Sequence, residues 1–252
     1  MLKKRVIPIL LYQQCTIVKS KKFNDFRNVG NAISSSKIYY SQDADELIIL
    51  NIDRKYKDIN ELERLVRKIS EVVFLPITVG GGINTLDDAC KIISAGADKI
   101  VVNSAVYEDY NIISEIGNIF GAQAVVVAID LKKHGNEYYL YSKNGTTREN
   151  ISFEEHIRKS EIMGVGEFLI QSIDHDGCME GFDIELLKKV CNITNRPVIG
   201  CGGSGSYEDV LECFMETRVQ AVACGSLFNF SDSSPVRAAA FLKNLGIDTK
   251  AV

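Results

Sequence analysis

The segment LPITVGGGINTLDDACKIISAGADKIVVNS, residues 75–104, decides the fold of this chain. It begins with a short apolar run that ends in glycines, continues with helical periodicity from Thr85 to Ala95, and ends in a second apolar run. Both runs are apolar throughout rather than at alternate positions, which is typical of strands buried on both faces of a parallel sheet. The segment therefore predicts a strand–helix–strand unit with parallel strands.

Units of this kind recur along the whole chain of 252 residues. The apolar runs are 5–11, 46–52, 75–81, 99–104, 124–130, 167–173, 196–202 and 220–226. Helical periodicity covers Asn60–Glu71, Thr85–Ala95, Asn111–Phe120, Ser152–Met163, Ile184–Cys191, Ser206–Glu216 and Pro235–Leu245. Eight such units without a Pro- or Gly-rich linker predict an α/β fold, a (β/α)8 TIM barrel that forms one domain over residues 1–252. A doubly wound sheet is disfavoured because no GxGxxG follows the first run.

The two halves of the chain, about 1–120 and 121–252, carry similar acidic, glycine and serine positions in the same order. Under a shift of 121 residues, give or take one, the coinciding positions are Asp45–Glu46 with Gly166–Glu167, Ile52–Asp53 with Ile173–Asp174, Gly80–Gly82 with Gly202–Gly203, and Asn103–Ala105 with Gly225–Leu227. Unrelated half-barrels would not align acids, glycines and serines together. The sequence thus predicts an internal half-barrel duplication with an approximate twofold axis.

The composition excludes several classes of protein. Apolar residues make up 46% and charged residues 25%, and no apolar stretch approaches the ~20 residues of a membrane span. The N-terminal MLKKRVIPILLYQQ lacks the cleavage site of a signal peptide, and a net charge of −4 argues against a nucleic-acid binder. Seven cysteines without a CxxC pair favour reduced thiols in a cytoplasmic protein. Three histidines without metal-ligand spacing predict neither a metal nor a cofactor.

Polar and glycine-rich segments follow the strands at the face where TIM barrels carry their active sites. The candidate phosphate-binding residues are Gly81, Gly82, Asn103, Ser104, Asp176, Gly177, Gly202, Gly203, Gly225 and Ser226. Glycines let main-chain N–H groups approach an anion, and a following helix N-terminus adds a favourable dipole. Because the repeat supplies the cluster twice, we expect a ligand with an anionic group at each end. The alternative is that these glycines only permit tight turns.

Two residues are candidates for catalysis. Asp130 ends the apolar run AVVVAID (124–130), which places its carboxylate at the end of the barrel where TIM barrels carry their active sites. Partial burial there would raise its pKa, which suits a general acid or base. It could instead only cap the next turn. Lys19 lies in TIVKSKKF (16–23), which predicts either a basic flap over an anionic substrate or a solvated charged loop.

Four charged residues stand at the starts of strands, at the opposite face: Arg5, Glu46, Lys99 and Glu167. If they point inward, two positive and two negative charges would form a polar gate at the bottom of a central passage. Buried charges are tolerated only when they are paired, so an inward arrangement requires mutual ion pairs. Ordinary surface salt bridges are the alternative.

The whole chain resembles the cyclase subunit of imidazole glycerol phosphate synthase, a half-barrel-duplicated protein of histidine biosynthesis. The resemblance rests on KRVIP (4–8), Lys19, DEL (45–47), TVGGGI (78–83), GADKIVVN (96–103), GAQAVVVAID (121–130), SIDHDG (172–177) and GCGGSG (200–205). It implies a glutaminase subunit docked on the bottom of the barrel and ammonia that travels through a gate of four charged residues to a phosphorylated substrate. By position, Arg5, Glu46, Lys99 and Glu167 match that gate, Lys19 a mobile-loop lysine, and Asp130 one of two catalytic aspartates.

The chain departs from that family at two positions. Leu11 stands where the other catalytic aspartate is expected, and Asn51 replaces an aspartate in the second strand. Leucine cannot donate or accept a proton, so the pair of carboxylates is broken. In this respect the chain resembles paralogous cyclase-like proteins associated with amidination of bacterial surface sugars, which also pair with a glutaminase.

Two alternatives stay open beside an ammonia-dependent enzyme of that kind, and a third is disfavoured. The chain could be an authentic histidine-pathway cyclase that makes imidazole glycerol phosphate. It could be a non-catalytic scaffold that docks and activates a glutaminase. The related sugar-phosphate isomerase is disfavoured, because it needs two opposed carboxylates and only Asp130 remains.

Overall fold

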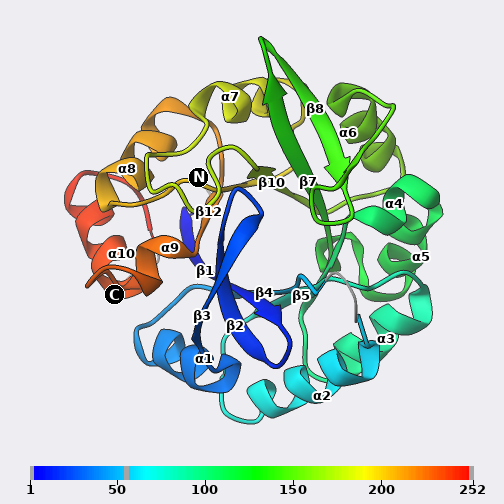
Figure 1. Ribbon diagram of the computed structural model, residues 1–252, viewed down its shortest axis with the longest axis horizontal. Helices are drawn as coiled ribbons and strands as arrows, with labels where there is room; N and C mark the ends of the chain where they lie inside the picture. The colour runs from blue at the N-terminus through cyan, green and yellow to red at the C-terminus, as the bar shows by residue number, and fades with distance from the viewer. Residues whose placement is uncertain (1–2, 54–56, 250–252) are drawn as a thin grey trace.

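Eight parallel strands form a closed barrel in the computed structural model, which describes residues 3–53 and 57–249 (Figure 1). Around the barrel the strands are β1 (Arg5–Gln13), β4 (Leu47–Asn51), β5 (Ile77–Gly80), β6 (Lys99–Val102), β7 (Val125–His134), β10 (Glu167–Ser172), β11 (Val198–Cys201) and β12 (Ala221–Cys224). The barrel closes because β12 pairs in parallel with β1, from Arg5 opposite Ala221 to Pro8 opposite Cys224. The predicted (β/α)8 fold is confirmed, while the predicted domain, 1–252, includes residues outside the described ranges.

Helices surround the barrel and follow its strands in turn. The larger ones are α1 (Ala32–Ser41), α2 (Ile59–Ser70), α3 (Leu86–Ser94), α5 (Asn111–Phe120), α6 (Phe153–Ile162), α7 (Ile184–Ile193), α8 (Tyr207–Glu216) and α10 (Pro235–Asn244). All seven predicted helices are present, and among the larger helices of the described ranges only α1 was missed. Its sequence AISSSKIYYS is rich in serine, a weak helix former that leaves no clear apolar stripe. Among the described residues no helix is long and apolar enough to cross a bilayer.

Two apolar layers hold the barrel together. One lies between the sheet and the helices, and the other fills the barrel interior. Side chains alternate along a strand, so in β1 Val6 and Leu10 face the helices while Ile7 and Ile9 face the interior. Both faces of the eight barrel strands are therefore buried over most of their length, which explains the continuous apolar runs in the sequence.

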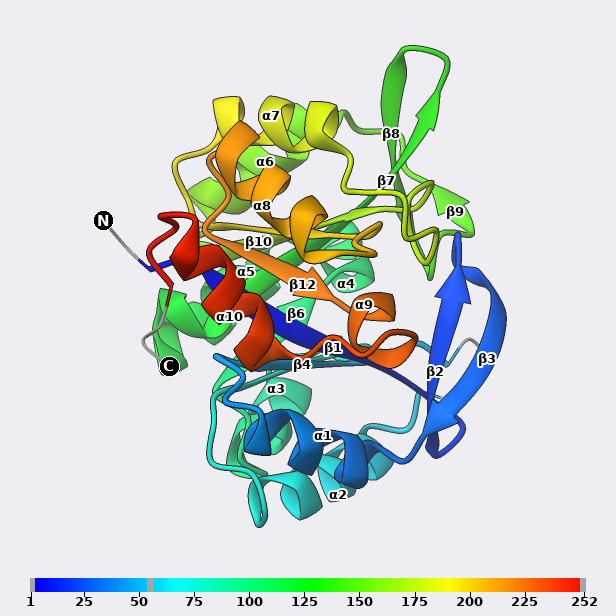
Figure 2. The same cartoon turned by 90° about the vertical axis from the view of Figure 1, so that its left-hand side faces the viewer.

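The two halves share structural details that no periodicity predicted. The first strand of each half continues into an antiparallel hairpin, β2 (Thr16–Lys21) with β3 (Asn24–Gly30) after β1, and β8 (Glu137–Ser142) with β9 (Thr147–Arg148) after β7. Short helices α4 (Ser104–Glu108) and α9 (Ser226–Asn229) also occupy matching places. In the side view both hairpins lie at the same end of the barrel (Figure 2). These shared details support a duplicated half-barrel.

Helix caps repeat with the same spacing. Thr85 with Asp88 begins α3 and Ser206 with Asp209 begins α8, and each pair forms a complete capping box. Ser152 accepts a hydrogen bond from the amide of Glu155, but the Glu155 carboxylate binds Lys159, so the capping box at the start of α6 is only half formed.

The matched caps should contribute equally to stability. We expect Thr85→Ala and Ser206→Ala each to lower the free energy of unfolding by about 1 kcal/mol, because an amide in the first turn of the helix loses its acceptor. Urea denaturation measures both values. Ser34→Ala in the exposed part of α1 is the control, and a loss there as large as at the caps would contradict this account.

Candidate active site

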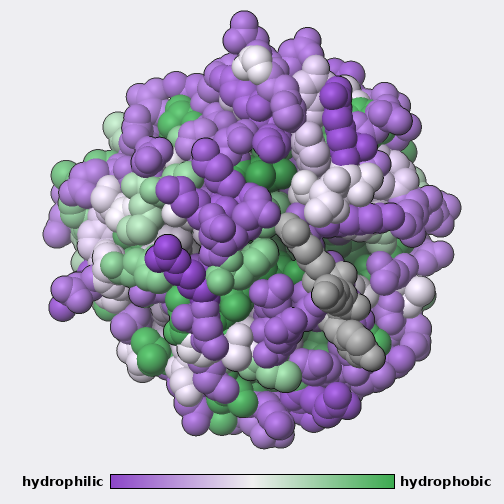
Figure 3. Space-filling model, in the orientation of Figure 1, coloured by the Kyte–Doolittle hydropathy of each residue, from purple (hydrophilic) through white to green (hydrophobic). Residues whose placement is uncertain are grey.

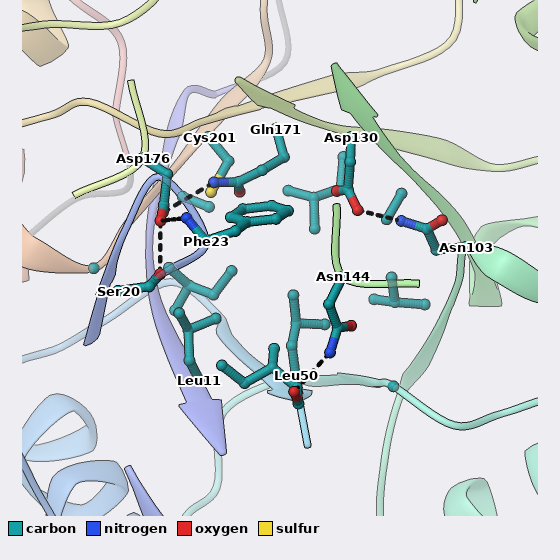
Figure 4. A pocket seen from close by; sticks show the side chains of 18 of the residues that line it. Leu11, Ser20, Phe23, Leu50, Asn103, Asp130, Asn144, Gln171, Asp176 and Cys201 are labelled. Atoms are coloured by element: carbon teal, nitrogen blue, oxygen red, sulfur yellow. Dashed lines mark hydrogen bonds between the residues drawn. The ribbon is translucent and has the colours of Figure 1, made fainter. Parts of the chain in front are cut away.

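A cavity opens at the carboxyl ends of the barrel strands and draws its walls from both halves of the chain (Figure 4). Lys19, Asp130 and all ten candidate phosphate-binding residues line it. The hairpin formed by β2 and β3 crosses in front of the barrel centre in Figure 1. From this side the surface is mostly hydrophilic, with hydrophobic residues visible between the surrounding segments (Figure 3). The barrel topology thus brings these candidates together around one space, which we call the mouth cavity.

Asp130 is a buried carboxylate on the wall of the mouth cavity, near the middle of the long strand β7. Its Oδ2 accepts a hydrogen bond of 2.9 Å from Nδ2 of Asn103. Burial raises the pKa of Asp130 to about 7, although the Asn103 bond and the positive charge of Lys57 oppose the shift. A carboxyl group with such a pKa can both donate and accept a proton near neutral pH.

The two glycine clusters have the same backbone geometry. Gly81 has φ +92° and Gly202 has φ +95°, a region that residues with a side chain rarely adopt. A Cβ at Gly81 would lie 2.0 Å from the carbonyl oxygen of Asn51, and one at Gly202 would lie 2.8 Å from that of Ser172. Asn51 and Ser172 are themselves 121 residues apart, so each cluster packs on the equivalent strand end. Helix N-termini follow both clusters, which suits a pair of anion sites.

Lys19 lies in the β2 strand rather than in a solvated loop. Its side chain is buried, with only 4% of the residue exposed, and Nζ donates a hydrogen bond of 2.9 Å to the carbonyl oxygen of Ile9. Burial lowers the pKa of Lys19 to about 8, with the charge of Asp176 opposing the shift. Lys21 at the end of the same strand and Lys22 directly after it are exposed. One lysine of the three therefore belongs to the mouth cavity.

Asp176 fastens the β2–β3 hairpin over the barrel. Its Oδ2 accepts hydrogen bonds from Oγ of Ser20 (2.6 Å) and the amide of Phe23 (3.3 Å), and its carbonyl oxygen accepts one from the amide of Lys22 (2.9 Å). Gly177 lets this loop approach closely, since a Cβ there would lie 1.9 Å from the Ser20 carbonyl oxygen. No pattern in the sequence predicted this contact, which joins positions far apart in the chain.

Leucines lie on the wall opposite Asp130. Figure 4 shows Leu11 across the cavity from Asp130, with Leu50 beside Leu11. Both side chains pack against the apolar barrel interior. The buried side chain of Asn51 accepts a hydrogen bond of 3.0 Å from the amide of Asp53, so it closes a turn. The mouth cavity therefore presents the Asp130 carboxylate on one side, and on the other side leucines together with the Asp176 carboxylate that binds the hairpin.

Other lining residues were not predicted. Nζ of Lys57 donates to Oδ1 of Asn144 (3.3 Å), and Nδ2 of Asn144 donates to the Ile52 carbonyl oxygen (2.7 Å), so the turn after β8 is tied to the first half of the barrel. Gln171 also lines the cavity and donates to Oδ1 of Asp176 (3.2 Å). Gln171 is a polar residue near the end of the apolar run EFLIQS, and this position could have predicted that it lines the site.

At the opposite end, four side chains form a continuous ring of ion pairs. Arg5 pairs with Glu46 (2.7 Å) and with Glu167, and Nζ of Lys99 lies 3.1 Å from a carboxylate oxygen of each glutamate. The glutamate side chains are 3% and 7% exposed, whereas Arg5 and Lys99 are 25% and 20% exposed. Thr78 adds a hydrogen bond to Glu46. We call these four residues the charged ring.

The charged ring and the mouth cavity lie at the two ends of one apolar interior. Ile7, Ile48 and Leu169 each follow a member of the ring by two residues along the chain, and they belong to the interior cluster. Ile9, Val101, Ala128 and Ala223 belong both to that cluster and to the cavity wall. In the part of the chain that the structure describes, no group of three or more His, Cys, Asp or Glu residues could hold a metal ion.

Comparisons with known proteins agree with this geometry. The family described as histidine biosynthesis protein matches residues 5–234. The chain is 36% identical over 250 residues to imidazole glycerol phosphate synthase subunit HisF of Exiguobacterium sibiricum, which covers 99% of this chain and 100% of the relative. It is 38% identical over 236 residues to the protein of the same name from Lactococcus lactis subsp. lactis, covering 93% of this chain and 91% of the relative.

The raised pKa of Asp130 predicts a pH-dependent stability. An acid whose pKa is higher in the folded state than in the unfolded state contributes its full stabilisation at pH values below the pKa of the unfolded state. For Asp130 this contribution is lost as the pH rises from about 4 to about 7. We therefore expect Asp130→Asn to unfold at higher urea concentration than the wild type at pH 8, with a gain on the order of 3 kcal/mol that shrinks toward pH 4. Equal pH profiles for the two proteins would contradict a raised pKa.

Proposed function

Because the chain belongs to the histidine biosynthesis protein family and is similar over nearly its whole length to HisF subunits, we propose that it is a HisF-like enzyme subunit that uses ammonia. In this proposal a HisH-like glutaminase docks on the face that carries the charged ring. Ammonia enters there, passes along the apolar interior and is added to an electrophilic carbon of an anionic, phosphorylated substrate in the mouth cavity.

The charged ring is the observation that carries the proposal. Arg5, Glu46, Lys99 and Glu167 close the end of the barrel with ion pairs between neighbours, and the carboxylates are almost completely buried. A barrel that only needed stability could fill this place with apolar side chains, which are often as favourable as buried ion pairs. A neutral set of paired charges instead suits a gate that a small polar molecule crosses.

Exposed apolar side chains support a docking face around that gate. Phe74 precedes β5, Ile119 and Ile162 lie in the last turns of α5 and α6, and Met215 lies in the last turn of α8, so all four lie where the chain returns to the start of a strand. They are 75%, 57%, 82% and 66% exposed. Apolar side chains gathered at one end of a protein favour contact with another protein.

At the mouth, each residue has a role in the proposal. The glycine clusters bind the anionic groups of the substrate, and Lys19 closes over it with the β2–β3 hairpin. Asp130 transfers protons, which its pKa of about 7 permits near neutral pH. Leu11 stands at the position where the resemblance implies the second catalytic aspartate for cyclisation in the histidine pathway. Amidination of a nucleotide-linked or surface sugar therefore fits the cavity better than that cyclisation.

Two other functions are the alternatives that the experiments below distinguish from this proposal. The relatives named HisF favour an authentic imidazole glycerol phosphate synthase subunit, in which another group replaces the missing aspartate. A scaffold that only docks and activates a glutaminase would keep the apolar face and the charged ring but consume no ammonia.

The residue at position 11 should decide between the pathways. With ammonium and the bisphosphate ribulosyl substrate of the histidine pathway, we expect turnover about 10²-fold or more below that of the Exiguobacterium sibiricum subunit, because one of two acid–base groups is missing. Leu11→Asp should raise this turnover, whereas Leu50→Asp, which adds a carboxylate at another position of the same wall, should not. Normal wild-type turnover, measured from product formation, would establish the histidine-pathway alternative.

The docking face is tested by placing a charge on it. We expect Ile162→Asp to weaken binding of a HisH-like glutaminase by about tenfold or more, since an apolar contact would be replaced by a desolvated carboxylate. Phe230→Asp is the matched control, because Phe230 is 50% exposed but follows α9 at the mouth end. Titration calorimetry gives both affinities, and equal affinities for the two variants would place the partner elsewhere.

A further inference from the structure

We propose that the hairpin formed by β7 and β8 binds a nucleoside diphosphate, on the side of the sheet that continues from Asp130. The inference rests on the proposed function and deepens it, because it assigns the substrate to the sugars that are linked to a nucleoside diphosphate. The sugar then occupies the mouth cavity, and the base lies on the hairpin.

The two sides of the hairpin differ in character. Residues that lie directly opposite each other in an antiparallel pair point to the same side of the sheet. Asp130, which lines the mouth cavity, lies opposite Tyr141. The next pair on this side is Lys132 with Tyr139. The other side carries Leu131, which packs in the layer between the sheet and the helices. The side that Asp130 shares is therefore the one left open to a ligand.

Aromatic rings gather on the open side of the hairpin. The ring centres of His134 and Tyr139 are 5.6 Å apart, and those of His134 and Tyr141 are 6.1 Å apart. Nε2 of His134 lies 2.9 Å from the Tyr141 hydroxyl, and the Arg148 guanidinium, from β9, lies 3.7 Å from the centre of the Tyr139 ring. His134 and Arg148 are exposed, and both tyrosines are half-buried. We call these four residues the aromatic face.

This combination of rings and a guanidinium suits a heterocyclic base. Bases stack on aromatic side chains and on the plane of an arginine, and every base has a face that can do so. Arg148 covers the Tyr139 ring and is itself exposed, so a base would extend this stack. The Tyr139 hydroxyl donates a hydrogen bond to Glu137, which holds the ring in place. The hairpin extends beyond α7 in both ribbon views, so the stack is accessible (Figures 1 and 2).

The cations on the open side are not neutralised. Among the residues for which the structure gives a position, neither Lys132 nor Arg148 forms an ion pair with a carboxylate. Lys133, on the other side of the same strand, is paired with Glu185 at 2.6 Å. A phosphate oxygen forms strong, charge-assisted hydrogen bonds with lysine and arginine. A diphosphate would thus supply the anionic partner that these two cations lack.

The order of the residues along β7 matches the order of groups in such a ligand. From Asp130 to His134 the strand advances four residues, which is about 14 Å at the rise of an antiparallel strand. Lys132 lies midway. A sugar beside Asp130, a diphosphate beside Lys132 and a base on the aromatic face therefore follow one another in sequence. A sugar carried on a lipid diphosphate has no base and would leave the aromatic face unused.

Titration calorimetry on the intact protein tests the aromatic face, with uridine diphosphate, guanosine diphosphate and inorganic pyrophosphate as probes. We expect both nucleotides to bind about tenfold or more tightly than pyrophosphate, because stacking strengthens binding whatever the base. Tyr139→Leu should remove this advantage and leave the affinity for pyrophosphate unchanged. Tyr139→Phe keeps the ring and should retain it. Arg148→Met should weaken the binding of both nucleotides by about tenfold.

Arg27→Met is the matched control for Arg148→Met. Arg27 is also exposed, on β3 of the equivalent hairpin at the same end of the barrel, so its loss changes the net charge by the same amount. We expect it to leave the affinity for both nucleotides unchanged. Equal weakening by the two arginine variants would overturn the proposal. Nucleotides that bind no more tightly than pyrophosphate would also overturn it, and would indicate a diphosphate ligand without a base.

This inference and the proposed function fail separately, because nucleotide binding is measured without ammonia and without a glutaminase. If the nucleotides show no advantage over pyrophosphate while a HisH-like glutaminase still binds at the face that carries Ile162, the inference is rejected and the ammonia-using function stands. If the nucleotides bind on the aromatic face but no such glutaminase binds, the inference stands and the ammonia-using function is rejected.

Discussion

The hydrogen bonds between β12 and β1 are the constraint on which the rest of the structure depends. They close a sheet that would otherwise be open, and closure turns two rows of strand ends into two rings. Residues as distant as Arg5 and Glu167 become ion-pair partners at one ring, and Gly81 and Gly202 become walls of one cavity at the other. The chemistry of both ends follows from that single pairing, since none of these residues is close to its partners in sequence.

Much of this arrangement could be predicted because barrel topology converts sequence order into position. The eight strands were visible as apolar runs, and the residues that follow or precede them had to meet at the two ends. Asp130 and the glycine clusters were therefore found from the sequence, and so was the charged ring. The structure brings the predicted residues together, but their roles in catalysis remain proposals.

The missed features are those that depend on contacts rather than on periodicity. Helix α1 forms from a serine-rich segment, with its first turn capped by Asn31 and its buried face packed on the barrel. The hairpin of β2 and β3 is polar and covers the mouth, so it carries no apolar pattern that predicts strands. Its attachment through Asp176 joins two loops that only the folded barrel brings together. Local sequence could not have revealed either the attachment or the burial of Lys19 that results from it.

The repeated architecture also governs how the chain could be divided. A break in the connection between α5 and β7 would leave two pieces, each with four consecutive parallel strands. Each piece would then expose two unpaired sheet edges, β1 and β6 in the first and β7 and β12 in the second, with backbone groups that must find partners. Because the edges of one piece match those of the other, and by symmetry those of a second copy of itself, the free fragments should associate in pairs rather than persist alone.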